Sequence, residues 1–155
     1  MDETDVKILR ILSENSNTTT TDMTGKVNLS IPAINKRIQK LIQRGIIRRF
    51  TVLLDNKKVD KPIQAFILVI VQHIFAGDEL TEYIQNDPDV LECYAVTGEY
   101  DYLLKVCARD VESLEDKLLH LKRKLGIVKS HTMLSLLEHK FCPSPLPDLP
   151  ESDLT

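Results

Sequence analysis

Apolar residues in the first 45 positions fall into three stretches, and within each they recur every three or four residues, which is the spacing of helices that bury one face. Asp2 and Asp5 resemble a capping box and predict a first helix over about residues 3–14. Thr19 opens a second, shorter helix. Asn28 suits the left-handed backbone conformation that a tight corner between two helices requires. The pattern therefore predicts a helix-turn-helix whose third helix follows this corner.

The third helix is expected to begin at Ser30, to hold Pro32 in its first turn, and to end at Gly45. Its buried stripe is predicted to consist of Ile31, Ile34, Ile38, Leu41 and Ile42. On the other faces small residues come first and basic residues follow. This order would let the helix N-terminus enter a major groove while Lys36, Arg37 and Lys40 reach phosphates or base edges.

The segment over residues 46–55 predicts a strand, which would complete a winged arrangement with Arg48 and Arg49 near the backbone of a bound duplex. Any one of these basic residues could equally belong to an ordinary solvated face. The prediction of DNA binding therefore depends on the whole pattern together with the charge of this half of the chain.

The second half of the chain predicts the order strand, helix, strand, strand, helix, strand. The strands are expected at about residues 62–73, 89–96, 101–109 and 128–139, and the helices at 77–87 and 110–126. This order is typical of a ferredoxin-like βαββαβ domain, in which both helices cover one face of a four-stranded antiparallel sheet. The fold class is thus α+β, with an N-terminal winged helix-turn-helix.

The first predicted strand is apolar on both of its sides. Alternate residues place Phe66, Leu68 and Ile70 on one side and the residues between them on the other, so whichever face the two helices leave open is too apolar for water. We therefore expect a second subunit to cover it, so that the protein is a homodimer.

The charges divide the chain into two opposite halves. Residues 1–61 carry twelve Lys/Arg against seven Asp/Glu, whereas residues 62–155 carry eight against sixteen. The basic half suits a polyanion. We divide the chain into a winged helix-turn-helix domain (1–48), a linker strand (49–61), a ferredoxin-like oligomerisation domain (62–141) and a flexible proline-rich tail (142–155).

Composition excludes several other classes of protein. No apolar run reaches 18 residues and the N-terminus is acidic, so we expect no membrane segment and a cytoplasmic location. Cys93, Cys107 and Cys142 are an odd number without metal-site spacing, and the four histidines are scattered. We expect no metal, no cofactor and no catalytic residues.

The segment Thr97-Gly98-Glu99-Tyr100-Asp101 between two predicted strands combines a glycine, two carboxylates and a phenol. It could be a tight hairpin with a polar tip and nothing more. Alternatively, its exposed backbone N–H groups could hold a carboxylate while Glu99 or Asp101 pairs with an ammonium, as an amino-acid ligand would require.

The chain resembles the Lrp/AsnC family of feast/famine transcriptional regulators over about residues 1–140. The resemblance is carried by MDETDVKIL at the start, by SIPAINKRIQKL followed by GIIRRF, and by VTGEYDYLLK at residues 96–105. It implies a sequence-specific regulator that binds double-stranded DNA as a homodimer or as tetramers and octamers, with an amino-acid effector. By position, the implied DNA contacts are Ser30, Ile31, Pro32, Ala33, Lys36, Arg37 and Lys40, and the implied effector residues are Thr97, Gly98, Glu99, Tyr100, Asp101 and Ser135.

Two other functions remain as alternatives. Sirohaem decarboxylase subunits share this two-domain plan, but they would need histidines and arginines to hold the carboxylates of a tetrapyrrole. In this chain only His131 and His139 lie on the last predicted strand. The other alternative is a pure effector or assembly module with a vestigial DNA-binding half, which Thr18 and Gly25 favour and the basic third helix opposes.

Overall fold

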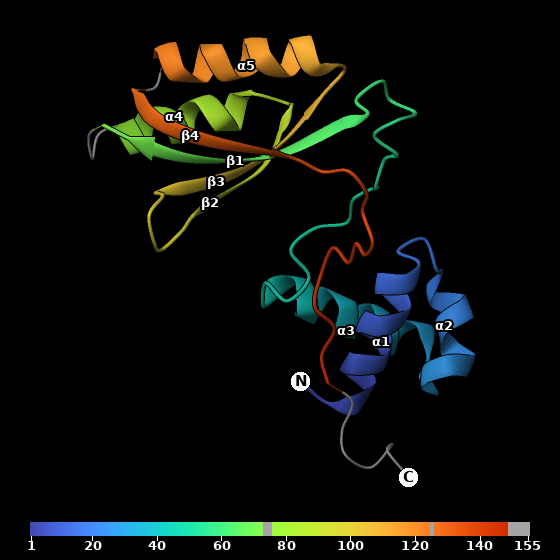
Figure 1. The fold of residues 1–155 in the computed structure, drawn as a ribbon. Coiled ribbons are helices and arrows are strands. Elements are labelled where there is room, and N and C mark those ends of the chain that lie inside the picture. Colours follow the sequence, from blue (N-terminus) through green and yellow to red (C-terminus); the bar gives the residue numbers. More distant parts are fainter. Residues whose placement is uncertain (73–75, 125, 149–155) are drawn as a thin grey trace. The chain divides into compact units, whose positions relative to one another are not determined.

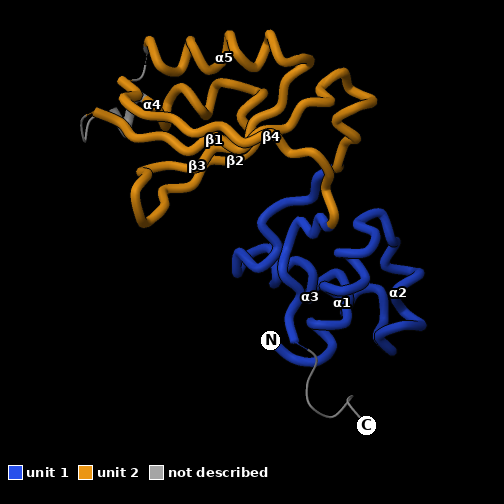
Figure 2. Tube along the Cα trace, in the orientation of Figure 1, with its two compact units in different colours: residues 1–52, 140–155 blue, residues 53–139 orange. Residues whose placement is uncertain are grey.

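A computed structural model of the chain describes residues 1–72, 76–124 and 126–148, with side chains except at 76–79 and 124. The chain divides into two compact units (Figure 2). Unit 1 combines Met1–Val52 with the C-terminal segment from Lys140 onward, and unit 2 is Leu53–His139. The predicted tail therefore belongs to the same unit as the helix-turn-helix.

Unit 1 contains three helices (Figure 1), which are α1 (Glu3–Glu14), α2 (Thr20–Val27) and α3 (Ile31–Gln43). Asp2 Oδ1 accepts a hydrogen bond from the Asp5 backbone N–H at 2.9 Å, and the reciprocal bond completes the capping box. Thr19 Oγ1 accepts from the Asp22 N–H at 3.2 Å, and Asn28 is left-handed with φ 51°. The predicted helices and the corner between them are confirmed.

The core of unit 1 is formed by all three helices and consists of Ile8, Leu9, Met23, Val27, Ile34 and Leu41. In α3, Ile34 and Leu41 are buried, but Ile31 and Ile42 remain 39% and 37% exposed. At about 100° per residue these two lie to one side of the line through Ile34 and Leu41. The buried stripe of α3 is thus narrower in the structure than the sequence predicted.

The strand predicted over residues 46–55 is absent from the described chain. Gly45 is left-handed with φ 70°, and the N–H groups of Ile46 and Ile47 then donate to the Leu41 carbonyl at 2.9 and 3.2 Å. A strand needs a neighbouring strand for its hydrogen bonds, and none of the described strands pairs with this segment. Residues 49–61 likewise contain no strand.

Unit 2 has the predicted βαββαβ order. Its elements are β1 (Ile63–Val71), α4 (Ala76–Asn86), β2 (Val90–Ala95), β3 (Tyr102–Ala108), α5 (Val111–Lys124) and β4 (Ile127–Leu134). The antiparallel sheet has the order β2-β3-β1-β4, and α4 and α5 lie on one of its faces (Figure 1). Ser113 N–H donates to Asp110 Oδ1 at 2.7 Å, so Asp110 caps α5 as expected. Leu125, expected at the end of that helix, lies outside the described residues.

The last strand is shorter than predicted, because it ends at Leu134 and the pattern extended it to residue 139. Leu134 is paired with Ala65 near the start of β1, and the Ser135 N–H makes one more bond to the Gln64 carbonyl. Pro62 comes just before β1 and has no N–H to offer. Beyond Ser135 the chain has therefore passed the end of its partner strand.

The core of unit 2 lies between the sheet and the helices. Ala65, Ile67 and Val69 of β1 pack there with Leu104 and Val106 of β3, and the helices add Leu80, Leu114 and Leu121. Phe66, Leu68 and Ile70 alternate with the core residues and are half-buried on the open face. Leu103 and Met133 lie beside Leu68 and Phe66, respectively, in the strand pairing. The open face is thus apolar, and its cover by a second subunit stays a prediction.

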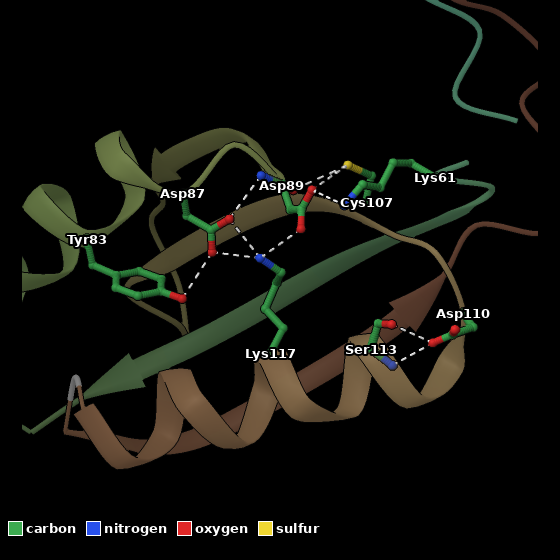
Figure 3. A network of polar contacts seen from close by, with 8 residues as sticks. All are labelled: Lys61, Tyr83, Asp87, Asp89, Cys107, Asp110, Ser113 and Lys117. Atoms are coloured by element: carbon green, nitrogen blue, oxygen red, sulfur yellow. Dashed lines mark hydrogen bonds and ion pairs between the residues drawn. The ribbon is translucent and has the colours of Figure 1, made fainter. Parts of the chain in front are cut away.

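A network of polar side chains ties α4, the start of β2 and α5 together (Figure 3). Lys117 Nζ contacts both carboxylate oxygens of Asp87 at 2.7 and 2.6 Å, and the Tyr83 hydroxyl donates to the same carboxylate at 3.0 Å. Asp89 pairs with Lys61, just before β1, at 2.7 Å and with Lys117 at 3.4 Å. The network fixes the end of the β2–β3 hairpin that is opposite to the turn at residues 97–101.

Candidate nucleic-acid interface and ligand turn

Four residues of α3 with its C-cap form one exposed or half-exposed row. They recur at helical spacing and are Ala33, Lys36, Lys40 and Arg44. Together with Arg37 and with the start of the chain they line a depression of about 470 Å³. Arg44 was not among the predicted contacts, although it lies four residues after Lys40 and the same spacing would have indicated it. The row can present three cations to one polyanion.

Arg37 differs from its neighbours because its charge is already paired. Its Nη1 contacts Asp2 at 2.6 Å and Asp5 at 2.7 Å, and Asp5 is buried. The hydrogen bond to Asp2, and next the one to Asp5, raise the pKa of Arg37. The pKa of Asp2 is lowered by the Asp5 backbone N–H and then by Arg37. The N-terminal cap of α1 therefore also holds the middle of α3.

The N-terminal end of α3 is open to a ligand. Ser30, Ile31 and Pro32 are exposed, and the Ser30 side chain forms no capping hydrogen bond with its own helix. The first N–H groups of a helix carry a partial positive charge and bind anions readily. Arg48 and Arg49 are exposed beyond Ile47, which packs against the core of unit 1.

The ligand-binding candidates of unit 2 lie in the turn between β2 and β3. Thr97, Gly98, Glu99 and Asp101 are exposed and Tyr100 is half-buried. Gly98 has φ 116°, which side-chain-bearing residues rarely adopt. The structure brings all five residues together beside the C-terminal end of β1.

Asp101 fastens the turn to β1. Its carboxylate accepts from the Val71 N–H at 2.9 Å, and its own N–H donates to the Val69 carbonyl at 3.0 Å. Its carbonyl accepts from Val96 at 2.9 Å. Asp101 thus shapes the turn, and one of its carboxylate oxygens is committed to the backbone.

The charge of Glu99 is balanced by Lys129 on β4, which the sequence analysis did not identify. The two form an exposed ion pair, and Lys129 Nζ lies 5.2 Å from the centre of the Tyr100 ring. The hydrogen bond with Lys129 lowers the pKa of Glu99 and raises that of Lys129. The predicted βαββαβ order could have indicated this neighbour, because it places the start of β4 beside the end of β1.

The turn has the groups that the two ends of an amino acid require. Within the described part of the chain, the backbone N–H groups of residues 97–100 donate to no backbone carbonyl, so they can receive a carboxylate. Glu99 and Asp101 supply negative charge for an ammonium, and Lys129 supplies a second partner for a carboxylate.

Ser135 does not join this group within one chain. Its N–H bonds to Gln64 near the start of β1, whereas the turn bonds to Val69 and Val71. Five residues of strand separate the two places, which corresponds to about 17 Å. The predicted βαββαβ order could have indicated this separation, because it places the end of β4 beside the start of β1.

The described residues contain neither a metal site nor a membrane-spanning helix. No group of three or more His, Cys, Asp or Glu side chains there could hold a metal ion. None of the helices in the same residues has the length and apolar character needed to span a bilayer.

Each of the two candidate sites lies in a part of the chain that matches a known protein family. Residues 64–145 match the model of the Lrp/AsnC ligand binding domain, and residues 1–48 match a model of winged helix-turn-helix DNA-binding domains. The transcriptional regulator AzlB of Bacillus subtilis is 35% identical over 126 residues, which is 77% of each chain. FL11, a regulator of the helix-turn-helix type from Pyrococcus horikoshii, is 32% identical over 142 residues, 90% of this chain and 92% of that one.

A solved structure extends the similarity to the whole fold. The complex of the regulator NMB0573 from Neisseria meningitidis with L-Met superposes with a TM-score of 0.89 at 32% identity, covering 94% of this chain and 96% of that one. The winged helix-turn-helix and the α+β regulatory domain are therefore shared features, although residues 46–55 form no strand here. The chain belongs to the Lrp/AsnC family of DNA-binding transcriptional regulators.

Proposed function

We propose that the protein is a sequence-specific regulator whose affinity for DNA, or whose assembly, changes when an amino acid binds the turn at residues 97–101. The observation that supports this most directly is the combination of open backbone N–H groups with Glu99 and Lys129 at one turn. The L-Met complex of the related regulator NMB0573 adds support from a second protein.

For the DNA side we propose direct contacts from the N-terminal end of α3 and from its row of cations. The proposed set is Ser30, Ile31, Pro32, Ala33, Lys36, Lys40, Arg44, Arg48 and Arg49. We assign Arg37 a positioning role, because a contact with phosphate would have to replace two ion pairs that it already makes with Asp2 and Asp5. A DNA-binding regulator works beside the chromosome, which supports a cytoplasmic location.

For the assembly we propose a homodimer that covers the open apolar face of the sheet. Phe66, Leu68, Ile70, Leu103 and Met133 would form the centre of the interface. A patch of this kind rarely stays exposed on a protein that works alone. Tetramers or octamers of such dimers are the further expectation from the family.

We do not propose an enzyme activity. The turn offers two carboxylates, which would repel the carboxylates of a tetrapyrrole, and the relatives compared above are regulators. His131 and His139, the candidates for such a site, are both exposed.

Thermal shift with each of the twenty amino acids tests the effector site. A ligand that binds only the folded state stabilises it by RT ln(1 + [L]/Kd), about 2.7 kcal/mol at a hundredfold excess over Kd. We expect at least one amino acid to raise the melting temperature of the protein. Its N-acetyl and carboxamide derivatives should bind at least tenfold more weakly, because each lacks one of the two charges that the turn recognises.

Matched variants locate the binding. Glu99→Gln should weaken binding about tenfold and so roughly halve the stabilisation at that ligand concentration, whereas Glu112→Gln, the same change at an exposed position of α5, should leave it unchanged. If no amino acid stabilises the protein, or if Glu99→Gln binds as tightly as the wild type, the turn is not the effector site.

A further inference from the structure

The C-terminal segment returns to the helix-turn-helix and contacts α1. Arg10 Nη2 donates to the Pro147 carbonyl at 2.8 Å, although 137 residues separate the two in sequence. In Figure 1 the segment after Lys140 (red) runs alongside α1 (blue) within unit 1. The chain thus enters unit 1 twice, once at its N-terminus and once after His139.

Burial on the outer side of α1 independently indicates a cover. Val6 is only 5% exposed, but it does not belong to the core formed by the three helices. At 100° per residue, Val6 and Arg10 both lie about 160° around the helix from the core residue Ile8. Without a cover this side of α1 would face water.

The burial of the Arg10 guanidinium also indicates that another segment covers the outer side of α1. Its Nε is buried, and among the described residues it has no hydrogen-bond partner. A charged group on the outer side of a surface helix loses its water only when another segment lies over it. The segment in contact is residues 140–148, through Pro147.

The segment is chemically suited to this place. Pro143, Pro145 and Pro147 each fix their own φ angle and so lower the entropy that docking costs. Proline has no N–H, and its carbonyl remains available as an acceptor for an arginine.

We propose that the outer side of α1, built around Val6 and Arg10, is a docking site for the chain's own residues 140–148, and that this segment is a structural part of the DNA-binding unit. The first turn of the same helix holds Arg37 of α3 through Asp2 and Asp5. The docked segment therefore stabilises the helix that positions α3. An effect on DNA affinity would rest on the proposed function, but docking itself does not.

Hydrogen exchange measured by mass spectrometry tests docking without DNA. A chain that ends at His139 should exchange the amides of α1 about tenfold faster than the full chain. Peptides from α5 serve as the internal control, and their exchange should not change. Equal exchange of α1 in both chains would overturn the proposal.

A coupling test separates docking from a general loss of stability. Val6→Ala should speed exchange of α1 severalfold in the full chain and have little effect in the chain that ends at His139, because there the cover is already gone. Val27→Ala, a change inside the helical core, should act equally in both chains. Equal effects of Val6→Ala in both chains would contradict docking.

The same experiment shows whose segment docks. The shortened chain, labelled with ¹⁵N, is mixed with an excess of unlabelled full chain. If its α1 stays unprotected, each segment docks on its own chain, as proposed. Recovery of protection would mean that the segment reaches a second copy, and this would overturn the assignment.

Discussion

Arg37 and Lys40 lie one turn apart on α3 and carry the same charge, but their surroundings give them different roles. Arg37 contacts two carboxylates, and one of them, Asp5, is buried. Lys40 is exposed in the row of cations. At the scale of single residues, charge alone does not distinguish a cation that holds the fold from one that meets a ligand.

Arg37→Ala should therefore lower the stability of unit 1. The change leaves the Asp5 carboxylate buried without its partner, which we expect to cost about 1–3 kcal/mol. Lys40→Ala should change stability by less than about 0.5 kcal/mol. It should nevertheless weaken DNA binding and reduce the slope of log affinity against log salt concentration by about one, the value of one phosphate contact. Chemical unfolding monitored by exchange of α1 and α3 amides measures the first effect, and DNA titration at several salt concentrations the second.

The two variants serve as controls for each other. If Arg37→Ala is as stable as the wild type and loses DNA affinity as Lys40→Ala does, Arg37 contacts DNA directly. That result would contradict the positioning role.

At the scale of elements, the network of Asp87, Asp89 and Lys117 joins α4, the β2–β3 hairpin and α5. Burial raises the pKa of Asp87, but the contacts with Lys117, the Asp89 N–H and Tyr83 outweigh it, so the net shift is downward. The pKa of Asp89 is also lowered, because Lys61 and Lys117 together outweigh burial. Burial, and next the bond to Asp87, raise the pKa of Tyr83 to about 12.

These lowered values predict how the stability of unit 2 depends on pH. Since the folded pKa of each carboxylate is below the ordinary value of 3.8, its contribution is complete above that value and is lost as the pH falls through the folded pKa. The free energy of unfolding should be nearly constant from pH 7 to about pH 5 and should decrease below about pH 4. Denaturant titrations followed by circular dichroism at each pH measure it.

Asp87→Asn should make that acid dependence shallower, and Asp116→Asn, an exposed position on α5, should leave it as in the wild type. If both variants follow the wild-type curve, the network does not contribute to acid stability.

The elements that the sequence predicted well are those whose pattern is local. The capping box of Asp2 and Asp5, the left-handed Asn28 and the continuous apolar run of β1 each depend on residues close in sequence. The strand expected at 46–55 and the long β4 failed because pairing depends on a distant partner. Residues 46–55 have none in the described chain, and beyond Ser135, which bonds to Gln64, the predicted extension of β4 has passed the start of β1.

The same distinction applies to the candidate sites. The row on α3 and the turn at 97–101 were visible as short motifs. Three other features depend on residues that are distant in sequence. The start of α1 binds Arg37, Lys129 lies against Glu99, and Ser135 lies far from the turn. The contact of Arg10 with Pro147 spans almost the whole chain, and composition alone predicted a flexible tail there.

At the scale of the whole molecule, the open face of the sheet carries the prediction about assembly. Leu68→Glu would place a charge at the centre of the proposed interface, so it should shift the protein toward the monomer in sedimentation experiments at micromolar concentration. Val111→Glu, on an exposed position of α5, should sediment as the wild type does. A monomeric wild type would contradict the proposed dimer.

The structure also shows where the opposite charges of the two halves of the chain lie. The excess of basic residues in 1–61 includes the cationic row of α3 and the exposed Arg48 and Arg49, whereas the acidic half contains the sheet and the turn. A polyanion should therefore bind unit 1 and leave unit 2 free to bind a small ligand.

The most direct measurement is binding of the protein to DNA from its own upstream region, titrated at several salt concentrations against an unrelated sequence. We predict tighter binding to its own region and an affinity that falls steeply with salt. Lys36→Ala/Lys40→Ala should bind at least tenfold more weakly with a shallower salt dependence, whereas Lys122→Ala/Arg123→Ala on α5 should bind as the wild type does. Binding that ignores sequence and salt, or that is unchanged by the α3 substitutions, would contradict the account.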